Sequence, residues 1–527
     1  MLTARSHAGH RNRLDWSAIP IHPLLAAAYP VVFLFATNAA DQVTLDPIWT
    51  PLAMAVGGAA VILAIAYALL RDWHRAALVA TVLVAGFFGY GHAWNAASEI
   101  IGSQWPLIGA WVLLVGIGLF VALRSAGWAR TATRALNLVA GIALLLNAWS
   151  VAGAMVAIGA VDATSNDLSQ LELAPPDVDD LPDVYNIILD RYASPTALAE
   201  TYDFDNEPFL TALEERGFQV ARAAHANYGK TPLSLASSLN IEMLDAEALK
   251  AEADDGEDRE PIHRVLRDHL VVPTALKELG YQYVHVGNWW TPTATNVDAD
   301  RTFRYEGQDE FSSVLAQTTL LRAFDEPDAA PTDPWDWRVL RGHTAYALDR
   351  LDEIPSMAGP KFVFGHLLLP HDPYVFDADG SFMNREQVKR QGQVDSYRRH
   401  LSYGNDRMIQ LVDRILAESG PDAVILLQSD EGPFPARYRA DEWGFQWRDA
   451  TEEELEEKFG ILLAMRLPDT DLEAEGFHDA LTPVNAFRII FNARFGTDLP
   501  LLPDRTWAHE DLSHFYDFFD ITDRLRR

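Results

Sequence analysis

The segment VYNIILD, residues 184–190, decides the fold of the larger part of the chain. Its six leading residues predict a strand, and Asp190 follows directly at the carboxyl end of that strand. Downstream, further strand-like segments at 281–286, 362–367, 423–427 and 460–467 alternate with helix-like segments such as 209–216 and 394–417. This alternation favours an α/β domain with a mainly parallel sheet and helices on both faces. Ligands of such sheets bind beyond the carboxyl ends of the strands.

Upstream of this strand the chain changes character twice. Residues 162–182 are polar, contain proline and lack periodicity, which is typical of a linker. Before them lie five uncharged apolar stretches, at 21–40, 48–70, 76–94, 105–123 and 136–161. Each approaches or exceeds the roughly 20 residues that cross a bilayer as a helix, and none keeps the polar face of a soluble core helix. A secretory signal peptide would be one short run, not five. We therefore predict a multi-pass transmembrane domain with five helices at 1–161, a linker at 162–182 and an extracytoplasmic domain at 183–527.

Basic residues between the apolar stretches predict the orientation. Lys and Arg near the ends of membrane spans are retained in the cytoplasm. Arginines occur only in the N-terminal tail and in the second and fourth connections: Arg5, Arg11, Arg13, Arg71, Arg75, Arg124, Arg130 and Arg134. The N-terminus is then cytoplasmic, and an odd number of spans places the large domain outside the cell membrane, on the periplasmic or extracellular side.

The charge of the chain is very uneven. Residues 1–161 carry 8 Arg, no Lys and 5 acidic residues, a net charge of +3, so the remainder carries −35 of the total of −32. So acidic a domain repels nucleic acid and anionic lipid headgroups. Binding of an anionic substrate therefore requires a local positive charge, such as a bound metal ion. The chain contains no cysteine, which excludes disulfides, thiolate metal ligands and a cysteine nucleophile.

Three carboxylates are expected at one edge of the sheet. Asp190 ends one predicted strand, and Asp430 with Glu431 follows another within SDEGP. Neighbouring carboxylates repel one another unless a cation neutralises them. An all-oxygen set suits a hard divalent ion, so Mn²⁺ or Mg²⁺ is favoured and Zn²⁺ is the third choice. The alternative for each aspartate is a helix cap.

Thr231 lies in NYGKTPLSLASSLN, residues 227–240. Thr followed by Pro is typical of a helix N-cap and first turn. The hydroxyl then lies at the positive end of a helix, where an anion is stabilised, and a nearby metal would make it a nucleophile. Capping alone is the competing interpretation.

Two histidines and several cations complete the candidate site. His366 and His371 occur in FGHLLLPHDPY, at the end of a predicted strand and just past it. His371 is the better catalytic candidate because it lies on the loop side, whereas His366 is a substrate-binding candidate that the strand could bury. Arg191, Lys230 and His285 are weaker electrostatic candidates, chosen by their proximity to the motifs.

Three charged segments are predicted to be surface or lid rather than core. They are residues 252–260, 326–337 and 451–458. The last reads TEEELEEK and contains a capping-box pattern, Thr451 with Glu454, which predicts an exposed helix start.

Six stretches in consistent order carry a resemblance to a known family. They are VYNIILDRYASPTAL, DFDNEPFLTALEERGF, HANYGKTPLSLASSLN, FGHLLLPHDPYVF, LLQSDEGPFP and TPVNAFRIIF. Together they resemble the sulfatase-like hydrolase/transferase family of bacterial integral membrane proteins, within the alkaline-phosphatase superfamily, over nearly all of residues 183–505. The layout of spans before an external catalytic domain is also similar to that of lipoteichoic acid synthase and the phosphoethanolamine transferases.

The resemblance implies an alkaline-phosphatase-like α/β domain and a set of site residues. The metal would be held by Asp190, Thr231, Asp430 and Glu431, and Thr231 would be the nucleophile. In the lipoteichoic acid synthase-like pattern the position of Glu431 is His, so this chain departs from that pattern. A formylglycine sulfatase is disfavoured because that chemistry needs Cys or Ser in a C/S-x-P-x-R setting, and here the matching residues 231–235 read TPLSL.

These observations leave two hypotheses in which the protein is an enzyme and one in which it is not. The leading one is a metal-dependent transferase or hydrolase of phosphate esters that acts on a lipid-linked or envelope glycan substrate at the bilayer. The second is a sulfatase or phosphodiesterase with water as the acceptor. The third is a catalytically degenerate envelope scaffold, which the Glu431 substitution favours. The substrate and the oligomeric state do not follow from the sequence.

Overall fold

The chain folds into two compact units. The computed structural model describes residues 19–37, 45–101, 103–160, 171, 173, 181–267, 270–305, 310–324 and 337–525. One unit, here called the helical unit, contains the N-terminal region to residue 159, apart from residues 41–43, together with residues 309–334. The other, here called the α/β unit, contains most of the remaining chain. The N-terminal arginines, most of the predicted linker and nearly all of segment 326–337 lie outside the described residues.

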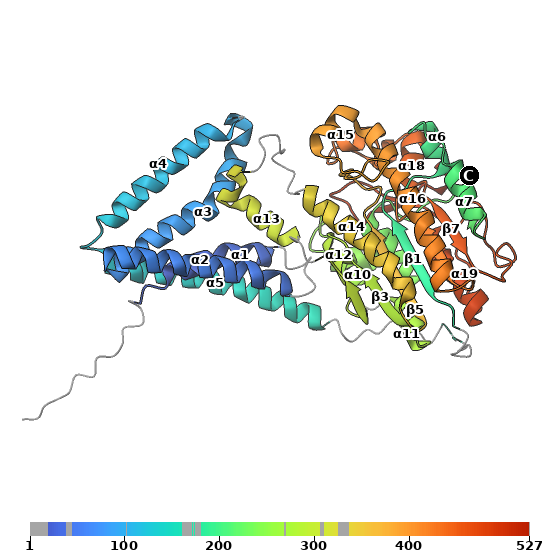
Figure 1. Cartoon of the computed structure of the whole chain (residues 1–527), viewed down its shortest axis with the longest axis horizontal. Helices are drawn as coiled ribbons and strands as arrows, with labels where there is room; N and C mark the ends of the chain where they lie inside the picture. The colour runs from blue at the N-terminus through green and yellow to red at the C-terminus, as the bar shows by residue number, and fades with distance from the viewer. Residues whose placement is uncertain are drawn as a thin grey trace, which may run out of the picture. The chain divides into compact units, whose positions relative to one another are not determined.

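Five apolar helices form the N-terminal part of the helical unit (Figure 1). They are α1 (His22–Thr37), α2 (Asp46–Leu70), α3 (Trp73–Ile101), α4 (Gln104–Leu123) and α5 (Ala129–Ala160). Four of them, α2 to α5, are long and apolar enough to cross a membrane. The first predicted span is the exception, because the 16 described residues of α1 rise only about 24 Å at 1.5 Å per residue.

The outer surface of these helices is apolar. Leu69, Ile100, Trp105 and Trp149 are each more than three-quarters exposed. In water such a surface would be unfavourable, whereas hydrocarbon solvates it. Length, composition and exposed apolar side chains together identify the unit as that of a membrane protein.

A later segment of the chain packs into the helical unit. Helix α13 (Glu310–Thr318) and the 3-10 helix η5 (Leu320–Phe324) lie beside α1, α2 and α3 (Figure 1). Phe311 and Leu315 of α13 join an apolar cluster with Phe35 of α1 and Ile48 of α2. Gly91 of α3 allows this close approach, since a Cβ there would lie 2.1 Å from the carbonyl oxygen of Gln317.

The α/β unit is built on a seven-stranded sheet with the order β2-β7-β6-β1-β5-β3-β4. Its strands are β1 (Val184–Leu189), β2 (Gln219–Val220), β3 (Gln282–Val286), β4 (Arg301–Phe303), β5 (Lys361–Leu367), β6 (Val424–Gln428) and β7 (Leu463–Arg466). The five strands from β6 to β4 are parallel, and β7 and β2 are added in antiparallel pairings. A separate hairpin pairs β8 (Trp507–His509) with β9 (Phe518–Asp520). The predicted mainly parallel sheet is confirmed.

Helices cover both faces of this sheet. Tyr185, Ile187 and Leu189 of β1 pack on one side, against α6, α7, α14 and α16. Val184 and Ile188 point to the opposite side, which α8, α10, α11 and α19 cover. Alternate residues of the central strand are therefore buried on both faces, which explains its apolar sequence. Figure 1 shows α14 and α16 across one of these faces.

The helices of the α/β unit connect the strands. They are α6 (Pro195–Glu200), α7 (Glu207–Glu214), α8 (Thr231–Asn240), α9 (Ala246–Glu252), α10 (Glu260–Arg267), α11 (Val271–Glu278), α12 (Thr291–Ala294), α14 (Trp337–Glu353), α15 (Arg385–Gln391), α16 (Gln393–Glu418), α17 (Ala436–Ala440), α18 (Glu452–Phe459) and α19 (Pro483–Phe495). Short 3-10 helices occur at Ile354–Ser356, Trp447–Asp449 and Thr522–Arg524. Helix α16 covers the whole of the helix-like segment predicted at 394–417.

Helix α18 corrects the prediction for segment 451–458. The capping box of Thr451 and Glu454 is present. The second half of the helix, however, is buried rather than at the surface, and Lys458 is 0% exposed. The charges of Glu456, Glu457 and Lys458 are paired inside the protein, so the acidic run is not simply solvated.

Candidate active site and metal centre

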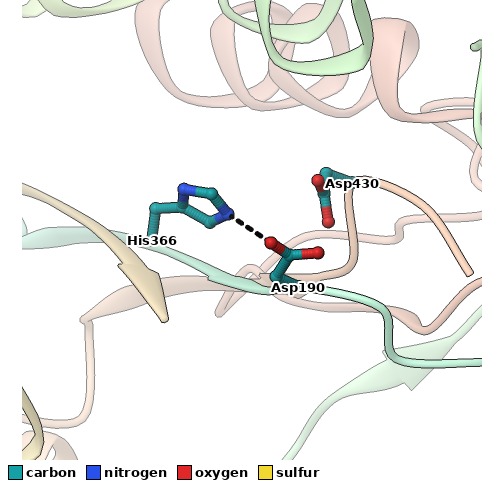
Figure 2. Close-up of side chains that lie close together, drawn as sticks. All are labelled: Asp190, His366 and Asp430. Carbon is teal, nitrogen blue, oxygen red and sulfur yellow. Dashed lines mark ion pairs between the residues drawn. The ribbon is translucent and has the colours of Figure 1, made fainter. Parts of the chain in front are cut away.

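Three adjacent strands bring Asp190, His366 and Asp430 together. Asp190 directly follows β1, His366 lies in β5, and Asp430 follows β6 by two residues. Because β6, β1 and β5 are parallel neighbours, their carboxyl ends meet at one edge of the sheet. One ligand atom from each of the three residues lies within 4.8 Å of the other two. Figure 2 shows the three side chains directed toward one another.

The potential ligand atoms of this group are buried, and most of them have no hydrogen-bond partner among the described residues. Asp190 and Asp430 are each 2% exposed and His366 is 0% exposed. Within the described part of the chain, Asp190 Oδ1, both carboxylate oxygens of Asp430, and His366 Nε2 have no partner at ordinary hydrogen-bond geometry. Buried polar atoms of native proteins normally have one. Two carboxylates and an imidazole that converge in this way fit a divalent cation.

The electrostatic environment of the two aspartates also suits a cation. Burial together with the charges of Asp190 and Glu431 raises the pKa of Asp430 well above its ordinary value, although Thr231 and Lys458 act in the opposite direction. Burial also works against ionisation of Asp190, but neighbouring His371, His366 and Arg191 outweigh it and hold the pKa of Asp190 low. Of the two aspartates, Asp430 is thus the one whose negative charge the surrounding protein stabilises less.

His366 is oriented by two neighbours. Its Nδ1 lies 2.9 Å from Thr293 Oγ1 and 3.1 Å from Asn288 Nδ2, while Nε2 lies 3.5 Å from Asp190 Oδ2. In the tautomer with the proton on Nδ1, Nδ1 donates to Thr293 Oγ1, the Thr293 hydroxyl donates to Asn288 Oδ1, and the Asn288 amide donates to the His366 carbonyl. Asn288 Nδ2 then lies beside Nδ1 without a hydrogen bond to it. This arrangement leaves the Nε2 lone pair directed at the carboxylates, as a metal ligand requires.

Thr231 starts helix α8 and lies close to Asp430. The carbonyl of Lys230 accepts the first helical hydrogen bond, from Ser234 N at 3.0 Å, so Lys230 is the N-cap and Thr231 the first helical residue. The prediction that Thr231 is the N-cap was therefore wrong by one position. Its hydroxyl is close enough to Asp430 to lower the pKa of that carboxyl. The side chain thus interacts with the group of Asp190, His366 and Asp430.

Glu431 has a different partner from Asp430. Its Oε1 lies 2.8 Å from Lys458 Nζ and 3.8 Å from Arg191 Nε. The group of potential ligands within 4.8 Å of one another contains His366 and leaves out Glu431, which differs from the predicted set.

Cations surround the ring of Phe434. Lys458 Nζ lies 3.3 Å from the ring centroid, Lys230 Nζ 4.3 Å, and the Arg191 guanidinium carbon 4.7 Å. Lys230 also donates to the Tyr438 hydroxyl at 2.8 Å. Burial lowers the pKa of Lys230 to about 7 and that of Lys458 to about 8. A phosphate or sulfate ester bound near this ring would experience the positive charges of three side chains, which suits anion binding.

Of the remaining candidate residues, His371 lies near Asp190, whereas His285 has partners in the sheet. His371 is half-buried, and burial lowers its pKa while the charge of Asp190 acts against that shift, so the imidazole is mainly neutral at pH 7. Asp372 forms an ion pair with Arg191. His285, by contrast, is held by the Tyr283 hydroxyl at 3.0 Å and the Thr293 carbonyl at 2.9 Å, and serves the core of the sheet.

Sequence reasoning missed the most buried cation of the site. Lys458 was assigned to a solvated charge run. Leu455 and Phe459, four residues apart on the same helix and both buried, were the signal that one face of α18 packs inward. Asn288 and Thr293, which orient His366, carry no recognisable motif.

Comparison with known proteins places the chain in a family. The model of the family described as Sulfatase matches residues 188–455, just over half of the chain. The chain belongs to the sulfatase family. The predicted resemblance is confirmed, and with it the prediction that the protein is an enzyme. The matched region contains Asp190, Thr231, His366, Asp430 and Glu431.

Solved structures show distant likenesses. The C-terminal periplasmic domain of EptC from Escherichia coli, in complex with zinc, is 14% identical over 66% of this chain and 95% of that one, with a TM-score of 0.43. The integral membrane protein lipooligosaccharide phosphoethanolamine transferase A from Neisseria meningitidis is 13% identical over 88% of this chain and 94% of that one, with a TM-score of 0.38. The lipoteichoic acid synthase LtaP from Listeria monocytogenes is 11% identical over 67% and 85%, with a TM-score of 0.38. No curated protein matches the chain.

Proposed function

We propose that this sulfatase-family protein is a metal-dependent transferase or hydrolase of phosphate esters, with Thr231 as its nucleophile. The observation that carries the proposal is the convergence of Asp190, His366 and Asp430 beside the Thr231 hydroxyl. Phosphate esters are chosen over sulfate esters because the layout of the chain resembles that of the phosphotransferases and because residues 231–235, TPLSL, do not fit the C/S-x-P-x-R setting that formylglycine formation needs.

The donor set narrows the identity of the metal. Asp190, Asp430 and His366 would hold the ion, and bound there it would supply positive charge to the phosphoryl oxygens and lower the pKa of the Thr231 hydroxyl. An imidazole ligand is less suited to Mg²⁺ than carboxylates are. Among the ions considered from the sequence, the structure therefore favours Mn²⁺ or Zn²⁺.

The chain's own residues divide the reaction between them. Thr231 Oγ forms a bond to phosphorus as the bond from phosphorus to the leaving oxygen breaks, and α8 presents its N-terminal amides to the phosphoryl group. His371, mainly neutral, takes up the threonine proton and returns it to the leaving alcohol. In the second half, an acceptor hydroxyl gives its proton to His371 and attacks phosphorus. The bond between phosphorus and Thr231 Oγ1 breaks, and His371 passes the proton to the released threonine oxygen. Lys230 and Arg191 bind the non-bridging oxygens.

The helical unit supports a proposal for the acceptor and for the location of the protein. We propose that the α/β unit works outside the cell membrane, with a cytoplasmic N-terminus, because arginines occupy only alternate connections. A lipid-linked or envelope glycan substrate then diffuses in the bilayer that the helices span. Water as the acceptor would make the protein a hydrolase, and an inactive envelope scaffold would have neither activity nor metal.

The nucleophile is tested with Thr231→Ala in the full-length protein, purified in detergent and loaded with Mn²⁺ or Zn²⁺. We expect cleavage of a generic phosphodiester to fall at least about 1,000-fold, because no covalent phosphothreonine can form. Acid quenching of the wild type should leave phosphate on the peptide that contains Thr231, detected by mass spectrometry. Products made with and without an added lipid alcohol separate transfer from hydrolysis.

Thr482→Ala is the matched control. Thr482 also precedes a proline at a helix start, but it is the N-cap of α19 and its hydroxyl donates to Asp504. Loss of its hydrogen bond to Asp504 should cost about 1 kcal/mol of stability and leave turnover per folded molecule unchanged. If Thr231→Ala cleaves the diester as fast as wild type with its metal bound, the assignment of the nucleophile is wrong.

A further inference from the structure

The sequence and the structure assign different roles to Glu431. Its position after Asp430 predicts a metal ligand, yet Oε1 lies 2.8 Å from the ammonium of Lys458. Both side chains are buried, at 3% and 0% exposure. Because Oε2 has no hydrogen-bond partner among the described residues, the competing assignment is a metal ion bound through that second oxygen.

Lys458 is held in place from several directions. Its Nζ donates to the Gly432 carbonyl at 3.0 Å, and the Gly432 amide donates to the Lys458 carbonyl at 2.8 Å. The face of the Phe434 ring lies 3.3 Å from Nζ. An ammonium with a carboxylate, a carbonyl and an aromatic face around it has exchanged its water for fixed partners.

The rest of α18 anchors that position. Glu456 accepts from Ser194 Oγ at 2.6 Å and lies 2.9 Å from His225 Nε2. Glu457 accepts from the Tyr202 hydroxyl at 2.7 Å. Three consecutive charged residues therefore each have a separate buried partner. The helix cannot turn or slide without breaking all three, so the ammonium of Lys458 is a permanent part of the site.

Charge counting shows what the site still needs. Asp190, Asp430 and Glu431 carry three negative charges when ionised. One divalent cation and the ammonium of Lys458 balance them. Arg191 is paired with Asp372, and Lys230 has a hydroxyl partner but no carboxylate within ion-pair distance among the described residues. A single metal ion thus leaves Lys230 to attract an anion, whereas a second one has no uncompensated carboxylate to bind.

We propose that Glu431 binds the ammonium of Lys458 instead of a metal ion, so that the site takes one divalent cation and Lys458 acts as a fixed second cation. The proposal rests on the proposed function and deepens it. The anionic group of the ester would then lie between one exchangeable ion and the fixed charges of Lys458, Lys230 and Arg191 around Phe434. Lys458 is a positioning residue here, since it acts through Glu431 and through the field at the substrate.

The test compares metal binding in full-length variants purified in detergent. Wild type, Glu431→Gln, the double variant Glu431→Gln/Lys458→Met and His366→Ala are stripped with chelator and titrated with Mn²⁺. Calorimetry gives the dissociation constant, and elemental analysis after dialysis gives the number of ions per chain. Unfolding midpoints are recorded for each variant without metal.

We expect one ion per chain in wild type and in both Glu431 variants, with dissociation constants within about threefold of each other. His366→Ala should bind at least about 30-fold more weakly. Glu431→Gln should lower the unfolding midpoint because it leaves the ammonium of Lys458 buried without its carboxylate, and the double variant should recover most of that loss. The double variant therefore keeps the test valid if the single variant does not fold.

Two results overturn the proposal. One is a loss of affinity in the Glu431 variants as large as that in His366→Ala, and the other is two ions per wild-type chain. Either would leave the proposed function intact. Conversely, a chain that binds one ion, tolerates the Glu431 variants and cleaves no phosphate ester would contradict the proposed function and leave the assignment of Glu431 standing.

Discussion

Replacement of Asp430 by asparagine should stabilise the protein without metal and destabilise it relative to wild type with metal. Asp190 and Asp430 present oxygens within 4.8 Å of each other in a buried place. Two unit charges at that distance repel by about 3.5 kcal/mol at an effective dielectric constant of about 20. Burial and the neighbouring carboxylates raise the pKa of Asp430, so partial protonation relieves some of this repulsion in wild type. Asparagine has nearly the same shape and removes the remainder. We expect a gain of on the order of 1–2 kcal/mol in the metal-free protein.

Metal should reverse the order of the two proteins. An ion at 100 times its dissociation constant stabilises the folded state by about 2.7 kcal/mol, provided that it binds only the folded state. Wild type should gain this amount, and Asp430→Asn should gain little, because an amide is a poorer ligand than a carboxylate. For a unit of this size about 2 °C of midpoint corresponds to 1 kcal/mol, so the wild-type shift is roughly 5 °C.

The assay is thermal unfolding of detergent-purified full-length protein in chelator and in excess Mn²⁺ or Zn²⁺. Asp422→Asn is the matched control, because Asp422 precedes the same strand β6 but is exposed at the other end. It should shift neither midpoint. The reasoning is refuted if Asp430→Asn unfolds below wild type in chelator, or if both proteins rise equally with metal.

Three further predictions concern other parts of the molecule. Asn288→Ala should weaken metal binding about 10–100-fold in calorimetry, because the ligating imidazole loses one of its orienting partners. Gly91→Ala should lower the unfolding midpoint by several degrees, since its Cβ would lie 2.1 Å from a carbonyl oxygen of the α13 segment, whereas Gly109→Ala meets nothing within 4 Å and should be neutral. Burial lowers the pKa of His285 from 6.5 to about 4, so the unfolded chain binds this proton first as the pH falls. The free energy of unfolding should therefore fall by about 3 kcal/mol between pH 6.5 and pH 4. In His285→Gln this decline should be smaller. Unfolding midpoints measured against pH check the prediction.

The carboxylates of the site were predictable because their positions are local features. A run of apolar residues followed by Asp190, and a second followed by Asp430, marks two strand ends. In a parallel sheet all such ends lie at one edge, so a rule about topology converts separate motifs into one site. The helical unit was predictable for a similar reason, since length and apolarity are properties of each segment alone. Only α1, at 16 described residues, falls short of that expectation.

The residues that complete the site could not be found in this way. His366 is buried inside β5, and only the side chains of Asn288 and Thr293 turn its Nε2 toward the carboxylates. The charge run around Lys458 looks solvated, because its partners Ser194, His225 and Tyr202 lie more than 200 residues away in sequence. Pairing of buried charges is a tertiary property, and no local pattern records it.

The place of Lys458 nevertheless follows from the sheet once one strand direction is known. β7 is antiparallel to β6, with Gln428 opposite Leu463, and the amide of Ser429 donates to the Leu462 carbonyl at 2.8 Å. The chain that enters β7 therefore runs back along the residues that leave β6. Beyond these strands the Gly432 amide donates to the Lys458 carbonyl at 2.8 Å, which places Glu431 beside the end of α18. A parallel β7 would have started at the opposite edge of the sheet and carried its preceding helix away from the metal ligands. The antiparallel strand is thus what delivers a buried ammonium to the edge at which the parallel strands place Asp190, His366 and Asp430.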